Sequence, residues 1–323
     1  MNEYMQPVKL SPAFKDFLWG GTRLKEAYNK NSDLDIVAES WELSTHPQGQ
    51  STVLSGPFSG LTLSELIEKN PTKILGAKAA EFAYFPLLIK FIDAHDNLSV
   101  QVHPDDAFGM EHEGEYGKTE MWYILECDEG AGLYYGVNRE LTREEFAQRI
   151  QDNTVLEVLN HVEVHKGDVF FIPAGTIHAI GKGIVICEIQ QNSATTYRVY
   201  DYDRRDAQGN TRPLHIEKAL QVSRLTPSDA VNDAKNIQEI AGGTKRLLSS
   251  CNYFTVYGLK VSGQMEVPIT SDTFQSVVVT DGFGTLKMGE TQLTLQKGDS
   301  VFIPSQNGVF TVSGDCELIL SYV

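Results

Sequence analysis

Residues 166–174 read KGDVFFIPA, and residues 297–305 read KGDSVFIPS. In both copies a Lys-Gly-Asp turn leads into a short apolar strand, and a proline ends that strand. The repeat predicts two related β-barrel halves. We place them at residues 1–245 and 246–323, with the boundary in the AGGTK stretch near 240–247.

The two copies differ at positions that matter for chemistry. Aligning the turns places Val309 opposite His178 and Gln275 opposite Glu120. If His178 and Glu120 bind a metal, the second half has lost that site. We therefore expect one active half.

The remainder of the chain is also mostly typical of β-strands. Short segments rich in β-branched and aromatic residues alternate with clusters of Gly, Pro, Asn and Asp. Three helices are expected: one begins with the capping box Thr62/Glu65, one with Thr142/Glu145, and a short one covers HIEKALQV. The segment PDDAFGMEHEGEYGK is typical of turns. This pattern favours a mainly β fold of two jelly-roll barrels with a few inserted helices. The expected strands are LLIKFIDA, LSVQVH, MWYILE, VFFIP, IVICEIQQ, YFTVYGLKV, SVVVTD, QLTLQ and ELILSYV.

Composition and charge exclude several classes of partner. The chain has 323 residues, with 27 basic and 43 acidic side chains and a formal charge of −16. Such a surface repels nucleic acid and anionic membranes. We see neither a secretory signal nor a run of about 20 apolar residues that could span a membrane. The four scattered cysteines are typical of reduced thiols. We expect a cytoplasmic protein that is a monomer or a weak homo-oligomer.

A nitrogen and oxygen ligand set is spread over three strand segments. Gln101 and His103 alternate along one strand, so their side chains project to the same face. Glu120 opens the strand EMWYILE, and His178 follows the turn PAGT. Two imidazoles, a carboxylate and an amide oxygen suit zinc, with manganese, iron or cobalt as alternatives. The other six histidines are treated as ordinary core or surface residues.

The motifs around these residues resemble known families. GDVFFIPAGTIHAI looks like the second cupin motif, and His103 with Glu120 resembles the first. Six segments over about residues 15–220, in the same order, resemble type I mannose-6-phosphate isomerases of the short bacterial form. The segments are FLWGG, ESWELSTHP, PLLIKFIDAHDNLSVQVHPDD, GKTEMWYILE, IPAGTIHAI and QNSATTYRVYDYDR. The C-terminal third matches only in general character.

The resemblance implies roles for particular residues. Gln101, His103, Glu120 and His178 would be the ligands of one zinc ion per chain. Arg198 in TYRVYD would be the active-site arginine, and Lys90 and Lys118 would line the same pocket, with a hydroxyl contact from Ser99. Carboxylates in matching segments are weaker candidates, and Trp19 is more typical of core packing. Those carboxylates are Glu42, Glu188, Asp201 and Asp203.

The implied reaction converts mannose 6-phosphate and fructose 6-phosphate into each other through an enediol. The metal would stabilise charge on a sugar oxygen, and a base would move a proton between C1 and C2. Arg198, Lys118 and Glu188 are the predicted catalytic residues, with Asp203 and His95 as other candidates for the base. Lys90, Ser99 and Lys118 are predicted to bind the phosphorylated sugar, and Arg198 is the alternative phosphate ligand.

Three other functions remain open from the sequence. The chain could be another metal-dependent cupin enzyme, a sugar-binding cupin without activity, or a protein with a structural zinc site. Structural zinc sites favour cysteine ligands, and no cysteine belongs to this set. The complete ligand set together with Arg198 favours an enzyme.

Overall fold

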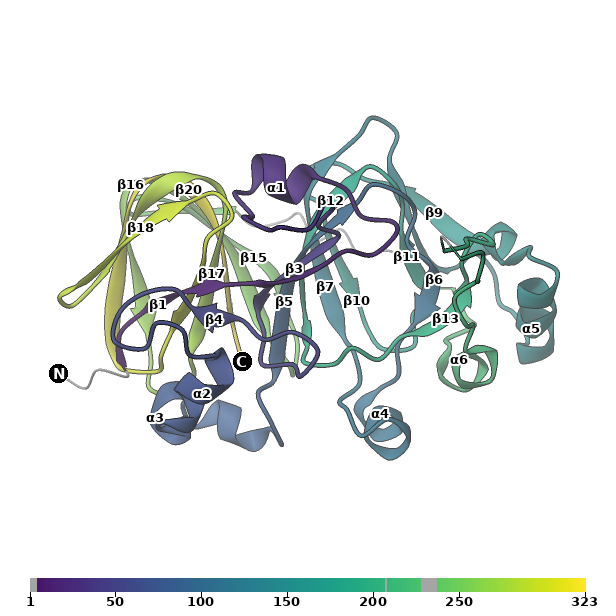
Figure 1. Cartoon of the computed structure of the whole chain (residues 1–323), viewed down its shortest axis with the longest axis horizontal. Coiled ribbons are helices and arrows are strands. Elements are labelled where there is room, and N and C mark those ends of the chain that lie inside the picture. The colour runs from purple at the N-terminus through teal and green to yellow at the C-terminus, as the bar shows by residue number, and fades with distance from the viewer. Residues whose placement is uncertain (1–4, 207, 228–236) are drawn as a thin grey trace.

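The computed structural model describes residues 5–206, 208–227 and 237–323, and the chain folds into two β-sheet halves that lie side by side (Figure 1). Two sheets face each other in the larger half. The six-stranded sheet has the order β10 (Val169–Ile172), β7 (Glu120–Cys127), β12 (Ile184–Gln191), β5 (Leu87–Ala94), β3 (Glu39–Leu43) and β2 (Ala13–Lys15). The five-stranded sheet has the order β13 (Tyr197–Tyr200), β6 (Val100–Val102), β11 (His178–Ile180), β8 (Gly132–Val137) and β9 (Leu159–Glu163).

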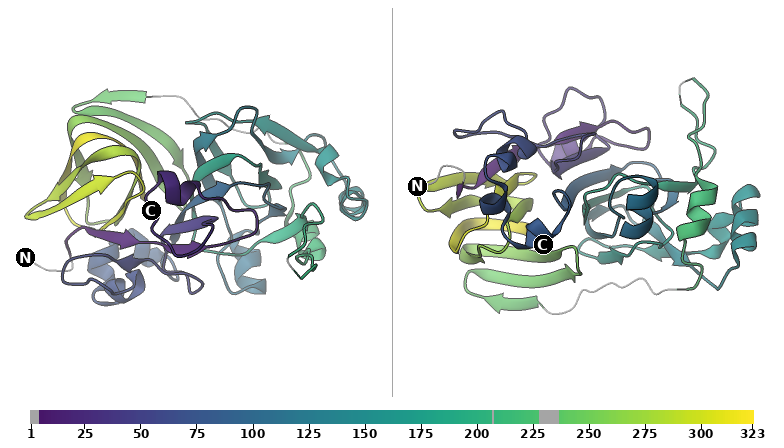
Figure 2. Two further views of the ribbon diagram at one scale, coloured as in Figure 1. Left: turned by 45° about the horizontal axis from the view of Figure 1, so that its top comes forward. Right: turned by 90° about the horizontal axis from the view of Figure 1, so that it is seen from below.

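The smaller half is one nine-stranded antiparallel sheet that curves around its own core, as Figure 2 shows. Its long strands β16, β17 and β20 supply most of that core. Two of its strands, β1 and β4, come from the first 53 residues of the chain. The order is β14 (Ile237–Ile240), β15 (Gly243–Ser250), β16 (Thr255–Ile269), β20 (Gly308–Tyr322), β17 (Gln275–Met288), β19 (Ser300–Ile303), β1 (Val8–Ser11) and β4 (Thr52–Val53), and β18 (Thr291–Gln296) pairs with β17.

Helices cover the edges and outer faces. α5 and α6 pack on the outer face of the five-stranded sheet, where Phe146 and Ile150 meet Val100 and Val102. The helices are α1 (Arg23–Ala27), α2 (Leu63–Glu68), α3 (Pro71–Leu75), α4 (Asp106–His112), α5 (Arg143–Gln151) and α6 (Ile216–Val222), with 3₁₀ turns η2 (Lys78–Glu81) and η3 (Val155–Val158).

Strands β5 and β12 are buried on both faces, which explains their nearly continuous apolar sequences. Leu87, Ile89 and Phe91 point toward the smaller half and share a core with Phe274 and Phe302. The alternate residues point between the two sheets of the larger half. Any polar residue in these alternate positions must therefore face the interior of that half.

A buried ion pair joins the two halves. Lys30 lies 2.6 Å from Glu42, and their side chains are 4% and 0% exposed. The Lys30 ammonium also donates to the Gly298 carbonyl, and the Ser300 hydroxyl donates to the Glu42 carbonyl. Burial raises the pKa of Glu42, against the opposing effect of Lys30.

Replacing Lys30 by methionine should lower the free energy of unfolding by about 3–5 kcal/mol, because it leaves a buried carboxylate without its cation. The loss should be smaller near pH ~5 than near pH ~8, because protonation of Glu42 removes the uncompensated charge. Denaturant unfolding at the two pH values measures it. The double variant Lys30→Met/Glu42→Leu should recover most of the stability. Equal losses in the single and double variants would contradict this account.

The structure confirms most of the elements expected from the sequence. Every expected strand is present, both Lys-Gly-Asp turns precede β10 and β19, and the fold is mainly β. The Thr62/Glu65 capping box forms both of its hydrogen bonds, and Thr142 caps α5. One expectation was wrong: the segment 104–118 contains α4, whose first turn is capped by the Asp105 carboxylate accepting from Phe108 N. The AGGTK stretch lies in the β14–β15 hairpin, and the division at residue 245 stays a prediction.

The repeat extends to the pairing register. Glu120 lies opposite Ile172, and Gln275 lies opposite Ile303, which is the matching residue of the second Lys-Gly-Asp copy. The counterpart of His178, Val309, is 49% exposed. The second half thus keeps the strand framework and replaces two candidate ligands by an amide and an alkyl group.

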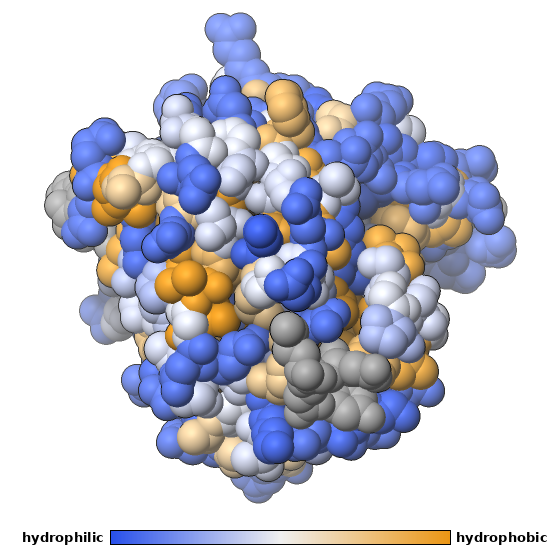
Figure 3. All heavy atoms as spheres, turned by 90° about the vertical axis from the view of Figure 1, so that its left-hand side faces the viewer, coloured by the Kyte–Doolittle hydropathy of each residue, from blue (hydrophilic) through white to orange (hydrophobic). Residues whose placement is uncertain are grey.

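The outer surface of the smaller half is mixed. Figure 3 shows small separate apolar areas among hydrophilic side chains on this face. Within the described residues, no helix has the length and apolar character needed to cross a bilayer. All four cysteines are unpaired.

Candidate metal centre and active site

Strand alternation places charged residues inside the larger half. Lys90 on β5 and Glu188 on β12 lie directly opposite each other in the sheet, and both face the interior between the two sheets. Trp41 on β3 lies opposite Lys90, with the ammonium 5.1 Å from the ring centre. These positions interrupt the otherwise apolar sequences LLIKFIDA and IVICEIQQ.

The structure brings together the four predicted metal ligands. The side-chain ligand atoms of His103, Glu120 and His178 all lie within 4.8 Å of one another, and all three residues are buried. The His178 Nε2 atom is 3.2 Å from Glu120 Oε1, and His103 Nε2 is 3.8 Å from Glu120 Oε2. Gln101 lies opposite His178 in the sheet, and its amide is 3.5 Å from the His178 Nε2 atom.

Backbone carbonyls orient both imidazoles. His103 Nδ1 donates to the Thr195 carbonyl at 2.8 Å, and His178 Nδ1 donates to the Thr176 carbonyl at 2.9 Å. With Nδ1 protonated, Nε2 of each neutral ring carries a lone pair that faces the Glu120 carboxylate, and the Lys118 ammonium lies 3.1 Å from that of His103. Burial lowers the pKa of His178 to about 3 and the pKa of His103 well below its usual value, so both rings are neutral near pH 7.

The arrangement fits a divalent metal ion. Glu120 Oε1 is buried, has no hydrogen-bond partner and faces the lone pair of His178 Nε2. Two facing lone pairs at a buried site are unfavourable unless a cation lies between them. Nitrogen and oxygen donors without sulfur suit zinc and other first-row ions, and a half-turn of the Gln101 amide presents its oxygen to the same centre.

Lys118 links the metal cluster to the candidate base. Its ammonium contacts Glu120, lies 3.1 Å from His103 Nε2 and lies 3.2 Å from Glu188 Oε1. Burial disfavours its charge, but the two carboxylates outweigh this effect and raise the pKa of Lys118. Burial likewise works against the charge of Glu188, yet Lys118 and Lys90 lower the pKa of this carboxyl. Glu120 has its pKa raised, chiefly by burial.

A cavity of about 210 Å³ opens beside this cluster and contains every predicted catalytic and substrate-binding residue. Aromatic and polar residues that the sequence did not single out complete its wall. Predicted residues in the lining are Lys90, Ser99, Gln101, Lys118, Glu188 and Arg198; the additional ones include Phe17, Glu39, Trp41, Gln48, Thr196 and Arg212. Trp19, expected as a core residue, is 4% exposed and packs in the core while also lining the cavity.

Two guanidinium groups stand at one side of this cavity. Arg198 lies opposite Gln101 in the sheet, and its Nε donates to the Ser99 hydroxyl at 3.2 Å. Burial lowers the pKa of Arg198, and the nearby charge of Arg212 lowers it further. Arg212 is held by two hydrogen bonds to Asp201, whereas none of the ion pairs among the described residues involves Arg198. This side of the cavity therefore favours an anion.

Several weaker candidates lie elsewhere. His95 lines a different cavity together with Arg23 and His161, and Asp203 is exposed outside the 210 Å³ cavity. Glu42 is committed to the ion pair with Lys30. Of the three candidate bases, the structure brings only Glu188 to the cavity.

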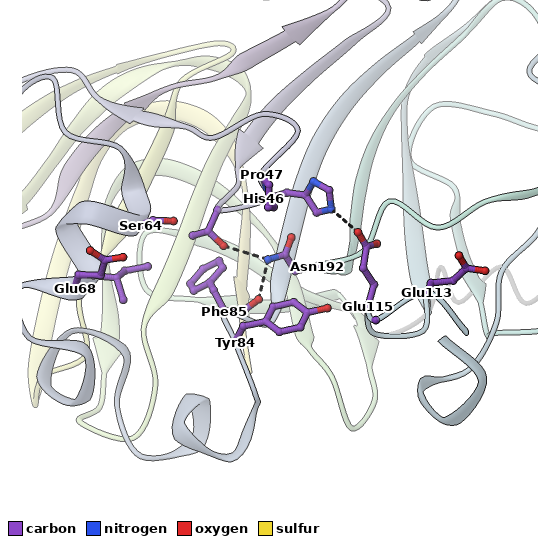
Figure 4. Close-up of a pocket in the computed structure, with 12 residues that line it drawn as sticks. His46, Pro47, Ser64, Glu68, Tyr84, Phe85, Glu113, Glu115 and Asn192 are labelled. Carbon is purple, nitrogen blue, oxygen red and sulfur yellow. Dashed lines mark hydrogen bonds and ion pairs between the residues drawn. The ribbon is translucent and has the colours of Figure 1, made fainter. Parts of the chain in front are cut away.

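A second cavity, of about 520 Å³, is larger than the first, and none of its lining residues is a candidate metal ligand (Figure 4). Its wall includes Tyr84, Phe85 and Asn192, whose amide donates to the Phe85 carbonyl. Glu115 also lines it and contacts His46 at 3.2 Å. The charged residues and the buried ligand cluster favour the smaller cavity as the site of chemistry.

Comparisons with known proteins point the same way. The family model described as phosphomannose isomerase type I, catalytic domain, matches residues 8–126, and the model described as mannose-6-phosphate isomerase, cupin domain, matches residues 244–323. A mannose-6-phosphate isomerase of Streptococcus mutans is 40% identical over 317 residues, covering 98% of each chain. Mannose-6-phosphate isomerase ManA of Bacillus subtilis is 39% identical over 319 residues, covering 98% of this chain and 99% of that protein. A crystal structure of a Bacillus subtilis mannose 6-phosphate isomerase superposes with a TM-score of 0.91 at 37% identity, covering 98% and 99% of the two chains.

Proposed function

The chain belongs to the type I mannose-6-phosphate isomerase family, and we propose from this that the 210 Å³ cavity interconverts mannose 6-phosphate and fructose 6-phosphate at one zinc ion. The observation that carries the proposal is the buried cluster of His103, Glu120 and His178 beside a cavity with four cationic side chains. We propose these three residues and Gln101 as the zinc ligands. Bound zinc would stabilise the negative charge that develops on a sugar oxygen.

Glu188 is the proposed base. Its carboxylate is ionised near neutral pH because Lys118 and Lys90 favour the charged form, so it can accept a proton. Glu188 would remove the proton from C2 of the aldose as the carbonyl oxygen O1 gains a proton, and would return it to C1 of the enediol as the hydroxyl on C2 loses its proton, or the reverse. The buried position keeps that proton from exchanging freely with bulk water.

Lys118 and Lys90 are proposed to act around the reacting atoms. Lys118 lies between Glu120 and Glu188, where its ammonium can donate a hydrogen bond to a sugar hydroxyl next to the reacting carbons. Lys90 is shared between Glu39 at 3.4 Å and Glu188 at 3.9 Å. Both ammonium groups are already compensated by carboxylates, which weakens the expectation that they carry the phosphate.

Arg198, Ser99 and Arg212 are proposed to hold the phosphate. Arg198 pairs with no carboxylate of the described residues, and its guanidinium donates only to the Ser99 hydroxyl and the Pro213 carbonyl there, which leaves its charge available for an anion. Guanidinium groups bind phosphate with two parallel hydrogen bonds. Binding energy from the phosphate would then orient C1 and C2 at the metal and at Glu188.

Removal of the metal tests the substrate and the cofactor together. We expect mannose 6-phosphate isomerisation, measured by a coupled assay for fructose 6-phosphate, to be lost after dialysis against a chelator and restored by one equivalent of zinc. Manganese and cobalt in parallel samples show whether zinc is preferred. Folded, zinc-loaded protein without isomerase activity would reject the proposed reaction. Full activity in protein shown by elemental analysis to be metal-free would reject the metal centre.

A further inference from the structure

Glu115 lies outside the active-site cavity, yet its carboxylate joins two segments that form the wall of that cavity. We propose that Glu115 is a positioning residue for the isomerase reaction, which acts by fixing the loop that orients the metal ligand His103. The predicted loss of kcat rests on the proposed isomerase function. The predicted loss of zinc affinity needs only the metal centre.

The segment that carries Glu115 is itself firmly held. Tyr116, the next residue, stacks on Tyr84 with ring centres 3.9 Å apart. The backbone N–H of each tyrosine donates to the hydroxyl of the other, at 2.8 and 2.7 Å. Further along, Gly117 N–H donates to the Asp106 carboxylate, and Lys118 N–H donates to the Pro104 carbonyl. The backbone next to Glu115 is therefore held by several hydrogen bonds, so its carboxylate can serve as a fixed acceptor for other segments.

One oxygen of Glu115 gathers the loop 193–195. Glu115 Oε2 accepts from Ala194 N–H at 3.0 Å, from the Ser193 hydroxyl at 3.2 Å and from the Thr195 hydroxyl at 3.3 Å. A carboxylate that accepts several donors at once holds them more strongly than neutral acceptors do. The three bonds fix both the backbone and the side chains of this loop.

The loop 193–195 in turn orients the metal ligand His103. The Thr195 carbonyl is the acceptor for His103 Nδ1, so its position sets the tautomer and the direction of the ring. Ala194 and Thr196, on either side, line the active-site cavity. A shift of the loop would therefore misdirect His103 Nε2 and change the wall next to the substrate.

The other oxygen of Glu115 holds the opposite wall. Glu115 Oε1 accepts from His46 Nε2 at 3.2 Å (Figure 4). In turn, His46 Nδ1 accepts from Gln48 N–H. Gln48 lines the active-site cavity, and the His46 ring packs edge-on against Trp41 at 5.6 Å. One carboxylate thus connects residues 193–195 with residues 46–48.

Because Glu115 is partly exposed, its replacement should disturb the geometry at His103 more than the stability of the fold. Its side chain is 30% exposed and faces the 520 Å³ cavity, so water can reach the donors that Glu115 leaves behind when it is removed. Hydrated donors cost little stability. Mobile water, however, does not hold the Thr195 carbonyl at one place, so the geometry at His103 should suffer more than the fold.

The test compares Glu115→Ala and Glu115→Gln with the matched control Glu68→Gln. Glu68 lines the same cavity, is exposed, and has no hydrogen bond to the loop 193–195 among the described contacts. Zinc affinity is measured by competition with a chromophoric chelator, together with kcat, KM and melting temperature. We expect Glu115→Ala to bind zinc about tenfold more weakly and to lose kcat more than KM changes. Glu115→Gln should lose less, because its single oxygen can serve only one of the two segments.

Each outcome has a distinct meaning. Wild-type zinc affinity in Glu115→Ala, with or without a lower melting temperature, would overturn the positioning role. If Glu115→Ala does not fold, unchanged zinc affinity in Glu115→Gln would overturn it equally. An equal loss in Glu68→Gln would assign the effect to the charge of the cavity and also overturn it. A wild-type chain that binds zinc but does not isomerise mannose 6-phosphate would reject the proposed function and leave the affinity comparison valid.

Discussion

Glu188→Gln should lower kcat for mannose 6-phosphate by about 10²–10⁴-fold, because glutamine keeps the shape of the side chain and removes the group that accepts the proton. KM and zinc content should change little, since Glu188 is not among the proposed ligands of zinc or phosphate. Steady-state kinetics with metal analysis on the same samples measures both effects. Transfer of deuterium from C2 of labelled mannose 6-phosphate to C1 of the product, followed by NMR, should slow by the same factor.

The matched control for this variant is Glu39→Gln. Glu39 lines the same cavity and contacts Lys90, so its replacement removes an equal charge from the same place. It accepts a hydrogen bond from the Trp41 ring nitrogen and is not proposed to move a proton. We expect it to lose far less activity. Comparable losses in the two variants would show that the charge balance around Lys90, rather than a base, controls the rate.

Arg198→Met should raise KM for mannose 6-phosphate by roughly 10–100-fold, since a hydrogen bond to a charged group contributes about 1.5–3 kcal/mol. Competitive inhibition by inorganic phosphate should weaken by a similar factor, which reports on the phosphate site without any turnover. Arg198→Lys should give an intermediate value, because it keeps the charge and loses the paired donors.

Arg205→Met is the control for this prediction. Arg205 belongs to the same stretch of chain, is exposed and does not line the cavity. Its removal should leave KM and phosphate inhibition as they are in the wild type. Unchanged phosphate inhibition in Arg198→Met would contradict the assignment, and a larger effect in Lys90→Met would return the phosphate to the lysines.

Most features set by residues close together in the chain, such as turns, helix caps and strand alternation, were predicted correctly from the sequence. The two Lys-Gly-Asp turns align the strands that follow them, so the correspondence of Val309 with His178 could be read from spacing, and that of Gln275 with Glu120 from the similar hydrophobic patterns of the upstream strands. The Thr62/Glu65 cap was predictable because its partners are three residues apart. Gln101 and His103 follow from strand alternation, and their partners Glu120 and His178 were found through motifs.

Features built from distant segments could not be predicted in this way. Arg212 lines the cavity because Asp201 holds it there, and nothing in the sequence TRPLHIEKAL distinguishes it from a surface arginine. Glu115 was hidden in a segment that looked like a turn, since its partners lie at residues 46 and 193–195. α4 was missed because it is short and has a glycine at its centre, which is a poor helix signal, while Asp106 in its first turn accepts from the distant residues Gly117 and Gln191.

The pairing of β1 with β19 also affects how the protein folds during translation. Val8 lies opposite Phe302, and Lys9 forms an ion pair with Asp299, so one of the first strands to leave the ribosome waits for one of the last. The larger half can collapse early during translation, whereas β1 of the smaller half has only the two-residue strand β4 as a pairing partner until β19 has emerged. Deleting β1 or deleting β20 would each remove a strand from the same sheet, so segments about 300 residues apart in the chain are both needed to complete it.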